Sequence, residues 1–406
     1  MNHQFNKPLF LLPNMTNTSK TKPIYNYSLS PDKETEAQFK ACYSEPFVTA
    51  AALMPDAHRG YVAPIGAVLI TKEFVVPAWV GYDIGCGVIA VKISAKNKST
   101  NLIKLVKSKS KAILSEVKKA VPMGLGEKNK DSSSLNEKTM STFKKILSSL
   151  ESKEHDKSVL QHIKQVAPRH LGSLGAGNHF ISLGFDEKTE KELWLVIHSG
   201  SRGIGHEVAK RYMIKSSGSQ KEYEKTAPLS DKSQMGKEYL ALLQFGLDFA
   251  LLNRLEMSYR VLDSLEKVLK IPLKSTLYAN KTHNHAILEK GRYIHRKGAT
   301  PAKKGERGVI PANMRDGSYL VEGLGSSKFL NSSSHGAGRA MSRKEARNKL
   351  TIAQFKALVP NVTADFNEEN LDESPIAYKP IKEVMEKQKT SVSTKKHIIP
   401  LINWQT

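Results

Sequence analysis

Residues 46–93 read PFVTAAALMPDAHRGYVAPIGAVLITKEFVVPAWVGYDIGCGVIAVKI and carry the strongest fold signal in this chain. Two β-branched runs, at residues 67–71 and 88–93, bracket glycine-dense loops, a texture that predicts strands joined by tight turns. Strand texture returns at residues 170–200 and 277–345. We therefore expect strands in three separate parts of the chain.

Helical patterns occupy the stretches between these strands. Residues 101–121 place leucine, isoleucine and valine near helical spacing, with lysines between them. Residues 236–270 carry a leucine and tyrosine stripe, which is typical of core packing and not of a cofactor site. Residues 124–136 are polar and predict a loop, and a helical tail is expected to begin near Ser342.

The 406 residues show no internal repeat and no change of composition that would separate autonomous domains. We therefore expect one large α+β domain with mixed sheets that spans residues 1–406. The lysine-rich region at about 100–168 is interpreted as a helical insertion into that body.

The charge is strongly positive, because 62 lysines and arginines face 39 aspartates and glutamates, a net charge of +23. Such an excess favours association with polyanions, most often nucleic acid, through phosphate contacts and counterion release. A surface of lysines that are merely solvated is the alternative.

The expected location is the cytoplasm. No apolar run reaches the roughly 18 residues that a membrane span requires. The apolar stretch within MNHQFNKPLFLLPNM, at residues 1–15, is too short and too weakly flanked for a signal peptide. The two cysteines, Cys42 and Cys86, exclude a disulfide scaffold and a four-cysteine zinc site, and fit a reducing compartment.

Asp83 and Cys86 lie three residues apart in the glycine-rich stretch GYDIGCG. A tight turn there can point a carboxylate and a thiolate at one place, and this pair suits a borderline divalent metal. The thiolate can also bridge two ions. A buried structural cysteine is the usual alternative.

Three histidines follow apolar sequence in polar surroundings: His179 in LGAGNHF, His198 after LWLVI and His283 in THNHA. Each one alone is more often a hydrogen-bonded structural residue than a ligand. Together with Asp83 and Cys86 they make five candidate ligands, enough for two adjacent metal ions.

His335 lies at the centre of NSSSHGAGRAMSR, residues 331–343. The small residues on both sides let a phosphate approach the backbone, and Arg339 and Arg343 supply charge in i, i+4 relation on an expected helix start. The simpler interpretation is an ordinary helix N-terminus that is capped by serine. A histidine in a phosphate cradle is alternatively a nucleophile toward an activated nucleotide.

Three nucleotide-binding signatures are absent from the sequence. It has no GxxxxGK[ST] phosphate loop and no GxGxxG at a strand–helix junction. It also lacks KxDG, the motif of ligases that carry a nucleotide on lysine, and the nearest string is MRDG at residues 314–317. A covalently held nucleotide is therefore not expected on such a lysine.

Seven stretches resemble the motifs of the RtcB family of RNA-splicing ligases, in the family's order and from about residue 40 to 380. They are MPDAHRGYVAPIG (54–66), VGYDIGCGV (80–88), LGAGNHF (174–180), HSGSRGIG (198–205), HNHA (283–286), HRKGAT (295–300) and SHGAGRAMSR (334–343). The resemblance implies an RtcB-like α+β fold in which mixed sheets surround a cleft for two metal ions.

The resemblance also implies roles for individual residues. His335 matches the histidine that becomes guanylylated, and Asp56 and Lys297 match further catalytic residues. The expected ligands of two manganese ions, with Cys86 as the bridge, are Asp83, Cys86, His179, His198 and His283. The expected nucleotide contacts are Asn178, Ser182, Ser334, Gly336, Ala337, Gly338, Tyr378 and Gln405. The expected RNA contacts are Arg202, Arg339 and Arg343.

The family reaction joins RNA that ends in a 3′-phosphate or a 2′,3′-cyclic phosphate to RNA with a 5′-hydroxyl, and consumes GTP. An archease-like activator assists many relatives. A phosphoesterase that processes RNA ends without joining them is the main alternative, and a non-catalytic RNA-binding scaffold is a third hypothesis. The intact ligand set and His335 argue against the scaffold.

Two positions depart from the family pattern. After GNHF the family usually has a hydrophobic residue and then a glutamate, whereas Ser182 follows Ile181 here. Gln405 stands where relatives carry a lysine that reaches the guanine. Because both positions belong to the base pocket, we expect GTP to be used with relaxed preference over ATP.

Overall fold

The computed structural model describes residues 22–97 and 99–405, so the N-terminal apolar stretch lies outside the described residues. Its larger main sheet has seven strands in the order β13-β14-β16-β6-β7-β5-β9, and all neighbours are antiparallel. The strands are β5 Gly87–Ala95, β6 Phe180–Asp186, β7 Leu193–Ser199, β9 Leu273–Thr282, β13 Arg307–Pro311, β14 Ser318–Gly323 and β16 Val392–Gln405.

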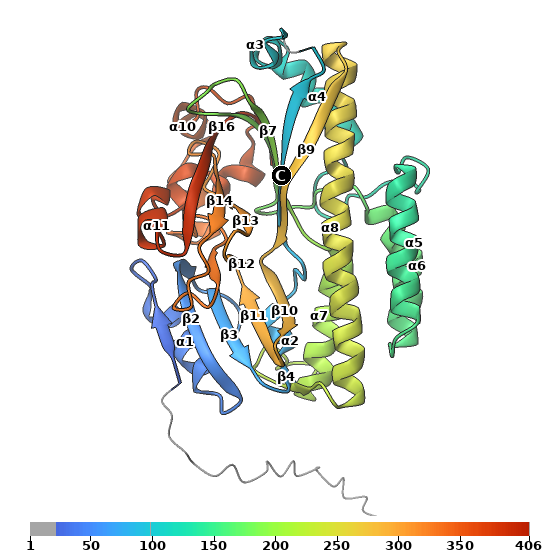
Figure 1. Cartoon of the computed structure of the whole chain (residues 1–406), viewed down its shortest axis with the longest axis vertical. Coiled ribbons are helices and arrows are strands. Elements are labelled where there is room, and N and C mark those ends of the chain that lie inside the picture. Colours follow the sequence, from blue (N-terminus) through green and yellow to red (C-terminus); the bar gives the residue numbers. More distant parts are fainter. Residues whose placement is uncertain (1–21, 98, 406) are drawn as a thin grey trace, which may run out of the picture.

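The second main sheet has five strands in the order β1-β2-β3-β11-β10 and lies below the first in Figure 1. Its strands are β1 Ile24–Asn26, β2 Val48–His58, β3 Ile65–Thr71, β10 Asn284–Glu289 and β11 Arg292–Lys297. Two small sheets pair β12 Ala299–Pro301 with β15 Ser332–Ser334, and β4 Phe74–Val75 with β8 Leu229–Ser230. His283 joins β9 to β10, so the chain passes from one main sheet to the other at this residue.

One long helix, α8 Gln234–Leu269, runs beside both sheets (Figure 1). Its N-cap Ser233 accepts a hydrogen bond from the Gly236 amide, and it ends at Lys270, whose φ of 59° is left-handed. Its N-terminal part packs in the core cluster around α7 and the five-stranded sheet, and its C-terminal part in the cluster around the seven-stranded sheet. The leucine stripe is therefore core packing, as its pattern predicted.

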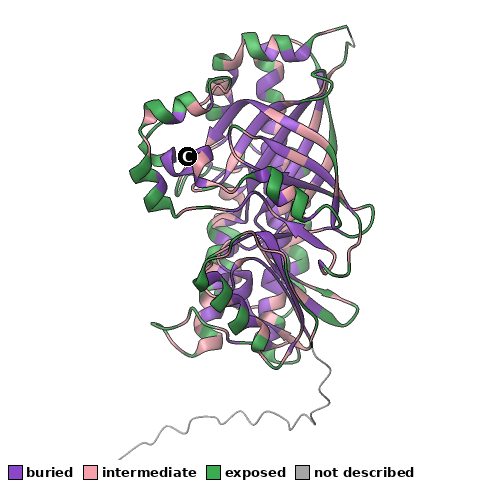
Figure 2. Ribbon diagram, turned by 90° about the vertical axis from the view of Figure 1, so that its left-hand side faces the viewer, coloured by how far each residue is buried: buried purple, intermediate pink, exposed green. Residues whose placement is uncertain are grey.

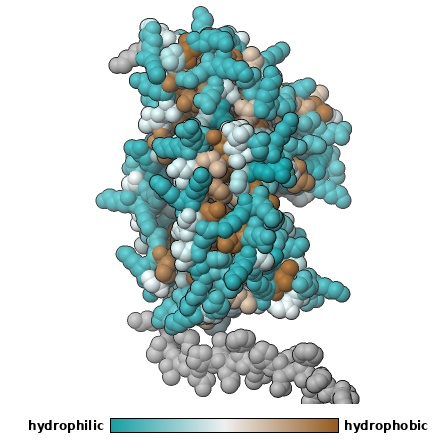
Figure 3. All heavy atoms as spheres, turned by 90° about the vertical axis from the view of Figure 1, so that its right-hand side faces the viewer, coloured by the Kyte–Doolittle hydropathy of each residue, from teal (hydrophilic) through white to brown (hydrophobic). Residues whose placement is uncertain are grey.

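Four helices from the lysine-rich region cover this framework: α3 Leu102–Ser108, α4 Ser110–Ala120, α5 Glu137–Glu151 and α6 Lys157–His170. The helical prediction for residues 101–121 is confirmed, except that the helix breaks at Lys109. Both α4 and α5 pack against α8. The strands of the sheets are mostly buried (Figure 2). The inward side chains of α4 and α5 are buried as well, while the outer face seen in Figure 3 is mostly hydrophilic. Whether this region is an insertion stays a prediction.

The remaining helices are all much shorter than α8. They are α1 Lys33–Ser44, α2 Pro77–Val80, α7 Arg202–Ser217, α9 Arg343–Lys349, α10 Ile352–Leu358 and α11 Ile381–Lys387, with 3₁₀ turns η1 Glu368–Glu373 and η2 Pro375–Ala377. Residues 124–136 form the expected loop. Among the described residues, no helix combines the length and the apolar character needed to cross a bilayer.

The prediction of a helical tail after Ser342 is wrong for the end of the chain. Residues 392–405 form β16, a 14-residue strand inside the seven-stranded sheet. It lies between β14 and β6, with a register shift between Pro400 and Ile402. Residues 392–405 contain β-branched and aromatic side chains that favour a strand, and pairing with two distant segments holds the strand despite Pro400.

Candidate active site

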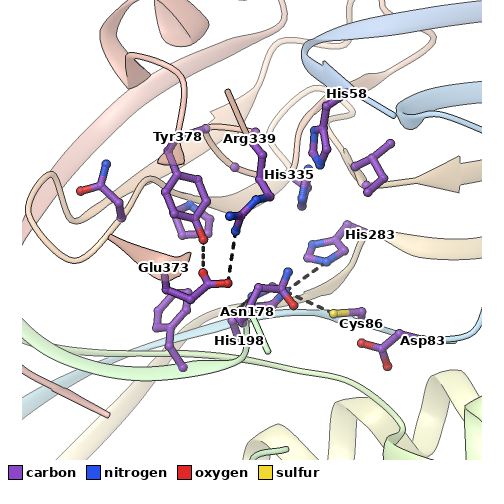
Figure 4. A pocket seen from close by; sticks show the side chains of 18 of the residues that line it. His58, Asp83, Cys86, Asn178, His198, His283, His335, Arg339, Glu373 and Tyr378 are labelled. Atoms are coloured by element: carbon purple, nitrogen blue, oxygen red, sulfur yellow. Dashed lines mark hydrogen bonds and ion pairs between the residues drawn. The ribbon is translucent and has the colours of Figure 1, made fainter. Parts of the chain in front are cut away.

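A cavity of about 1020 Å³ is lined by residues from both main sheets. Most of the site residues expected from the sequence line it, among them Asp83, Cys86, His198, His283 and His335. Figure 4 shows His335 above His283, with Cys86 and Asp83 below and Tyr378 and Glu373 to one side. The candidate metal ligands and the residues around Tyr378 therefore lie on different sides of His335.

Asp83 and Cys86 are brought together by the turn between α2 and β5. Gly81 and Gly85 have φ of 81° and 74°, and the Cys86 amide donates to the Asp83 carbonyl at 3.1 Å. A Cβ on Gly85 would lie 2.8 Å from the Ala250 side chain on α8. The stretch GYDIGCG therefore needs glycine at position 85 for its conformation and for its packing.

The histidines come from one end of adjacent strands. The strands β6, β7, β5 and β9 are consecutive in the sheet, and His198 on β7 pairs with Phe180 on β6 and Val88 on β5. His179 precedes β6, Cys86 precedes β5 and His283 follows β9. Antiparallel pairing places the start of one strand beside the end of the next, so these side chains meet where the four strands end on the same side of the sheet.

The five candidate ligands form two groups that share one sulfur. Cys86, His198 and His283 make one group, and Asp83, Cys86 and His179 make the other; in each, the donor atoms lie within 4.8 Å of one another. Cys86 Sγ lies 3.4 Å from His179 Nε2 and 3.2 Å from His198 Nε2. His179 Nε2 lies 3.0 Å from Asp83 Oδ2, and His198 Nε2 lies 3.3 Å from His283 Nε2.

Backbone carbonyls orient two of these rings. His179 Nδ1 lies 3.1 Å from the Leu174 carbonyl, and His198 Nδ1 lies 3.0 Å from the Asn178 carbonyl. Each Nδ1–H can donate to its carbonyl, which leaves the Nε2 lone pair aimed at the group. Metal-binding histidines are commonly fixed in this way.

The electrostatics of the group suit cations. Burial lowers the pKa of His198 and of His283 far below the usual value, so both rings are neutral donors. Burial raises the pKa of the Cys86 thiol, and Asp83 raises it further. Burial alone would raise the pKa of Asp83, but the charge of His179 and its hydrogen bond hold that pKa below its usual range. A divalent ion would displace the thiol proton, so the chemistry of these donors fits a divalent metal.

His335 has the geometry of an activated nucleophile. Its Nδ1 lies 2.6 Å from Asp56 Oδ2, and this carboxylate is fully buried. Burial alone would raise the pKa of Asp56, but the charge and hydrogen bond of His335 hold it below its usual value. An ionised Asp56 accepts from Nδ1–H and leaves the Nε2 lone pair free. The His335 ring centroid is 4.9 Å from that of His283, so this nitrogen lies beside the candidate metal group.

Backbone hydrogen bonds and a left-handed glycine shape the segment at residues 335–338. The amides of His335 and Gly336 donate to Asp56 Oδ2 at 3.1 and 3.3 Å. Gly338 has a φ of 72°, and a Cβ there would lie 2.1 Å from the Asp56 carbonyl. Gly336, Ala337 and Gly338 line the cavity, whereas Ser334 is fully buried in β15 with its amide bound to Gln388.

The helix that was expected to start at Arg339 begins four residues later, at Arg343, with Ser342 as its N-cap. The two arginines are therefore not on one helix. Arg339 instead forms an isolated antiparallel bridge with Tyr378, and the capping box of Ser342 and Glu345 fixes the start of α9.

Both arginines are held by carboxylates. Arg343 Nη1 lies 2.5 Å from Asp372 and 2.6 Å from Glu373, and its side chain is 43% exposed. Arg339 Nη1 lies 3.3 Å from Glu373, and Arg339 is mostly buried. Arg202 donates to Ser173 Oγ at 3.1 Å and packs against Gly175 behind His179, so it does not line the described cavity.

Two more expected residues border the metal group. Lys297 Nζ donates to the Val80 carbonyl at 3.0 Å, and burial lowers its pKa while Asp83 and Cys86 act to raise it. Asn178 lines the cavity, and its carbonyl orients His198 as described above.

The two divergent positions lie on neighbouring strands. Ser182 on β6 pairs with Asn403 on β16, and Gln405 pairs with Phe180. Ser182, Gln405 and Tyr378 line the same part of the cavity. The structure therefore brings together the residues that were expected to form a base pocket.

Glu373 is a site residue that the sequence did not reveal. Its carboxylate is almost fully buried and accepts from Gln405 Nε2 at 3.1 Å and from the Tyr378 hydroxyl. It also binds Arg339 and Arg343 through the other oxygen, as Figure 4 shows for Arg339. Burial raises the pKa of Glu373, and the two arginines oppose that shift. The adjacent acids in LDESPIAYKP, next to Tyr378 in a basic chain, are the available signal.

Arg254 is a second residue that the sequence did not reveal. It is fully buried on α8 and donates to the Gly85 and Ser199 carbonyls at 2.9 and 2.7 Å. Burial lowers its pKa to about 10, and Cys86 and Asp83 act to raise it. This cation therefore fixes the turn and β7 behind the cysteine. Its signal is the polar run NRLE inside the leucine stripe.

Comparisons with known proteins agree with this arrangement. The family model described as tRNA-splicing ligase RtcB matches residues 38–405. The RNA-splicing ligase RtcB of Escherichia coli K12 is 32% identical over 364 residues, which cover 83% of this chain and 85% of the relative. The tRNA-splicing ligase RtcB of Methanococcus maripaludis is 32% identical, covering 82% of each chain, and that of Nanoarchaeum equitans is 29% identical, covering 82% of this chain and 83% of its own.

Proposed function

Because the chain belongs to the RtcB family of RNA-splicing ligases, we propose that it seals RNA through a nucleotide carried on His335. The chain is an RNA ligase that joins RNA ends in splicing or repair. The substrates we propose are RNA ending in a 3′-phosphate or 2′,3′-cyclic phosphate and RNA with a 5′-hydroxyl. One observation carries the proposal: His335, oriented by Asp56, stands beside two candidate ligand groups in one cavity.

His335 Nε2 acts as the nucleophile. Its lone pair attacks the α-phosphorus of GTP, a P–N bond forms, and the bond to the leaving pyrophosphate breaks. The Asp56 carboxylate holds Nδ1–H and stabilises the positive charge that the ring acquires. Gly336, Ala337 and Gly338 line the cavity next to His335, where the phosphate is proposed to bind.

The nucleotide is then transferred from His335 to the 3′-phosphate of the RNA. A 3′-phosphate oxygen attacks the phosphorus held by His335, the P–N bond breaks, and Nε2 regains its lone pair. The 5′-hydroxyl attacks the activated 3′-phosphate and GMP leaves. A cyclic end is first opened to the 3′-phosphate. Arg339 and Arg343, which line the cavity, are proposed to hold the RNA ends, whereas Arg202 lies outside the cavity behind His179.

Asp83, Cys86, His179, His198 and His283 are proposed to hold two manganese ions. Such a pair neutralises phosphate charge and polarises attacking oxygens. Cys86 supports this because its sulfur belongs to both ligand groups. The two buried cations nearby, Arg254 and Lys297, favour a charged sulfur.

The nucleotide base is proposed to lie among Ser182, Tyr378 and Gln405. Glu373 turns the Gln405 amide so that its NH₂ faces the carboxylate, while Asn403 lies 3.5 Å from its Oε1. The Glu373 carboxylate lies near this pocket, but its acceptor sites are taken by protein donors, so it does not replace a glutamate at position 182. We therefore propose that GTP is used with relaxed preference over ATP. An archease-like activator is also proposed from the family.

Labelling separates this proposal from its alternative. The full chain is incubated with manganese and each of the four NTPs labelled at the α-phosphate, and then with RNA carrying the two kinds of end. We expect label on the protein, strongest with GTP, and joined RNA. Loss of the cyclic phosphate without label or joining would instead support a phosphoesterase.

A further inference from the structure

Three aromatic rings at the edge of the cavity have no part in the chemistry described above. Tyr61, Tyr82 and His206 line the same cavity as His335 and Asp83. Tyr61 is 70% exposed, and within residues 22–97 and 99–405 it is the one aromatic among the exposed large apolar side chains. An exposed ring beside a reaction cavity is a natural contact for a ligand with a flat face.

The rings support one another. The Tyr61 and Tyr82 centroids are 5.5 Å apart with an interplanar angle of 89°, and Tyr82 stacks on His206 at 4.8 Å and 18°. The Tyr82 hydroxyl donates to the Glu224 carboxylate and lies 3.5 Å from the Tyr223 hydroxyl. Tyr82 is therefore fixed at both ends and backs the exposed ring of Tyr61.

The backbone that carries Tyr61 is fixed as well. Gln38 on α1 donates from Nε2 to the Gly60 and Tyr61 carbonyls at 2.8 and 3.3 Å, and accepts from the Gly60 amide at 3.0 Å. A Cβ on Gly60 would lie 2.1 Å from the Ala63 carbonyl, so this turn needs glycine. The ring is thus held in place without being covered, which lowers the entropy lost when a ligand stacks on it.

We propose that Tyr61, backed by Tyr82 and His206, stacks on the terminal base of an RNA strand whose end enters the cavity. This rests on the proposed RNA ligase function. A base is favoured over a protein partner because the rings line the reaction cavity itself and the chain carries a net charge of +23. Stacking on an aromatic ring tolerates every base, which suits an enzyme that joins ends of varied sequence.

A coupling experiment tests the contact. Two fluorescent ten-nucleotide RNAs, one with a 5′-hydroxyl end and one with a 3′-phosphate end, carry either adenosine or an abasic nucleotide at that end. Anisotropy gives their Kd with the manganese-loaded full chain, as wild type, Tyr61→Ala, Tyr61→Phe and Leu288→Ala. Leu288 is the matched control, because it is 59% exposed and lines a different hollow.

We expect Tyr61→Ala to weaken binding of one adenosine end by about fivefold or more, the lower limit for base–aromatic stacking. The abasic form of that end should bind wild type and Tyr61→Ala equally. Whether the 5′-hydroxyl or the 3′-phosphate RNA is affected identifies the strand that contacts Tyr61. Tyr61→Phe should keep the affinity because its ring remains, and Leu288→Ala should match wild type.

Equal losses with adenosine and abasic ends would overturn the inference, and so would no loss at either end. A defect of Tyr61→Ala that appears only with an activating protein would show a protein contact and would also overturn it. Wild type that takes no label from GTP and joins no RNA would reject the proposed function. If the wild type takes label from GTP and binds RNA, but the effect of Tyr61→Ala does not depend on the terminal base, only the Tyr61 contact would be rejected.

Discussion

The metal half and the base half of the cavity are built in different ways. In the metal half, the candidate ligands lie at the ends of four consecutive strands of one sheet, and backbone carbonyls orient His179 and His198. In the base half, Tyr378 and Gln405 come from separate segments and meet through hydrogen bonds to one side chain, Glu373.

This difference bears on one of the two positions where the chain departs from its family. Strand register and backbone carbonyls leave little freedom to change a metal ligand, because a moved donor atom leaves the others unmatched. A side-chain contact such as that of Gln405 with Glu373 can be exchanged alone. Ser182, the other divergent position, lies on β6 and lines the same cavity.

The largest expected effect is that of His335→Ala. It removes the nucleophile, so labelling by GTP should be abolished, while manganese content stays near that of the wild type. Mass spectrometry and metal analysis on the same sample measure both. His162→Ala, an exposed histidine, is the control and should label normally. Undiminished labelling of His335→Ala would identify another nucleophile.

Cys86→Ser tests the metal half. Because one sulfur belongs to both ligand groups, the variant should lose most manganese from both positions, and labelling should fall with it. Cys42→Ser is the matched control, since Cys42 is the other buried cysteine and lies in the apolar core. If Cys86→Ser retained one full equivalent of manganese per chain, the sulfur would not bridge the two ions.

Glu373→Gln tests the base half. Hydrogen bonds of a buried charge contribute about 1.5–3 kcal/mol, so the GTP concentration for half-maximal labelling should rise at least about tenfold. Manganese binding should not change. The exposed Glu369→Gln is the control from the same segment. If the metal affinity of Glu373→Gln fell equally, the two halves would not be separable.

Ser182→Glu with Gln405→Lys should sharpen base choice. A glutamate accepts from the guanine N1–H and amino group, and a lysine donates to O6, so the ratio of GTP to ATP labelling rates should rise by about tenfold. The measurement compares initial rates for the two nucleotides. A wild type that is already strict for GTP, with no change in the double variant, would mean that other residues read the base.

The smallest effect is expected for single surface lysines. RNA binding should weaken steeply with salt, and each lysine that contacts a phosphate should lower the log–log slope by about one when replaced by alanine. Lys104 and Lys111, both exposed on α3 and α4, are suitable positions. A flat salt response of the wild type would identify these lysines as a solvated face.

The sequence predicted the metal half more fully than the base half. Asp83 and Cys86 lie in one glycine-rich turn, and His198 closes an apolar strand, so local patterns placed their donors. The local signals of Glu373 and Arg254, a pair of acids and a polar run in a helix, do not indicate a role, because their partners lie far away in the chain. Gln405 was named from the family alone, and its strand was expected to be helical.

The same reason explains the errors in the fold. The helix on residues 236–270 was correct because its stripe repeats along one segment. The strand β16 depends on pairing with β14 and β6, and neither partner can be identified from residues 392–405 themselves. Long-range strand pairing decided both this strand and the site beside it.

The most direct test of the central claim is X-ray absorption at the manganese edge of the loaded full chain. Two ions bound by the groups that share Cys86 should give two manganese per chain, a sulfur scatterer on each, and a metal–metal distance of about 3.5–4 Å. A single manganese per chain, or two ions without sulfur in their coordination, would contradict the account.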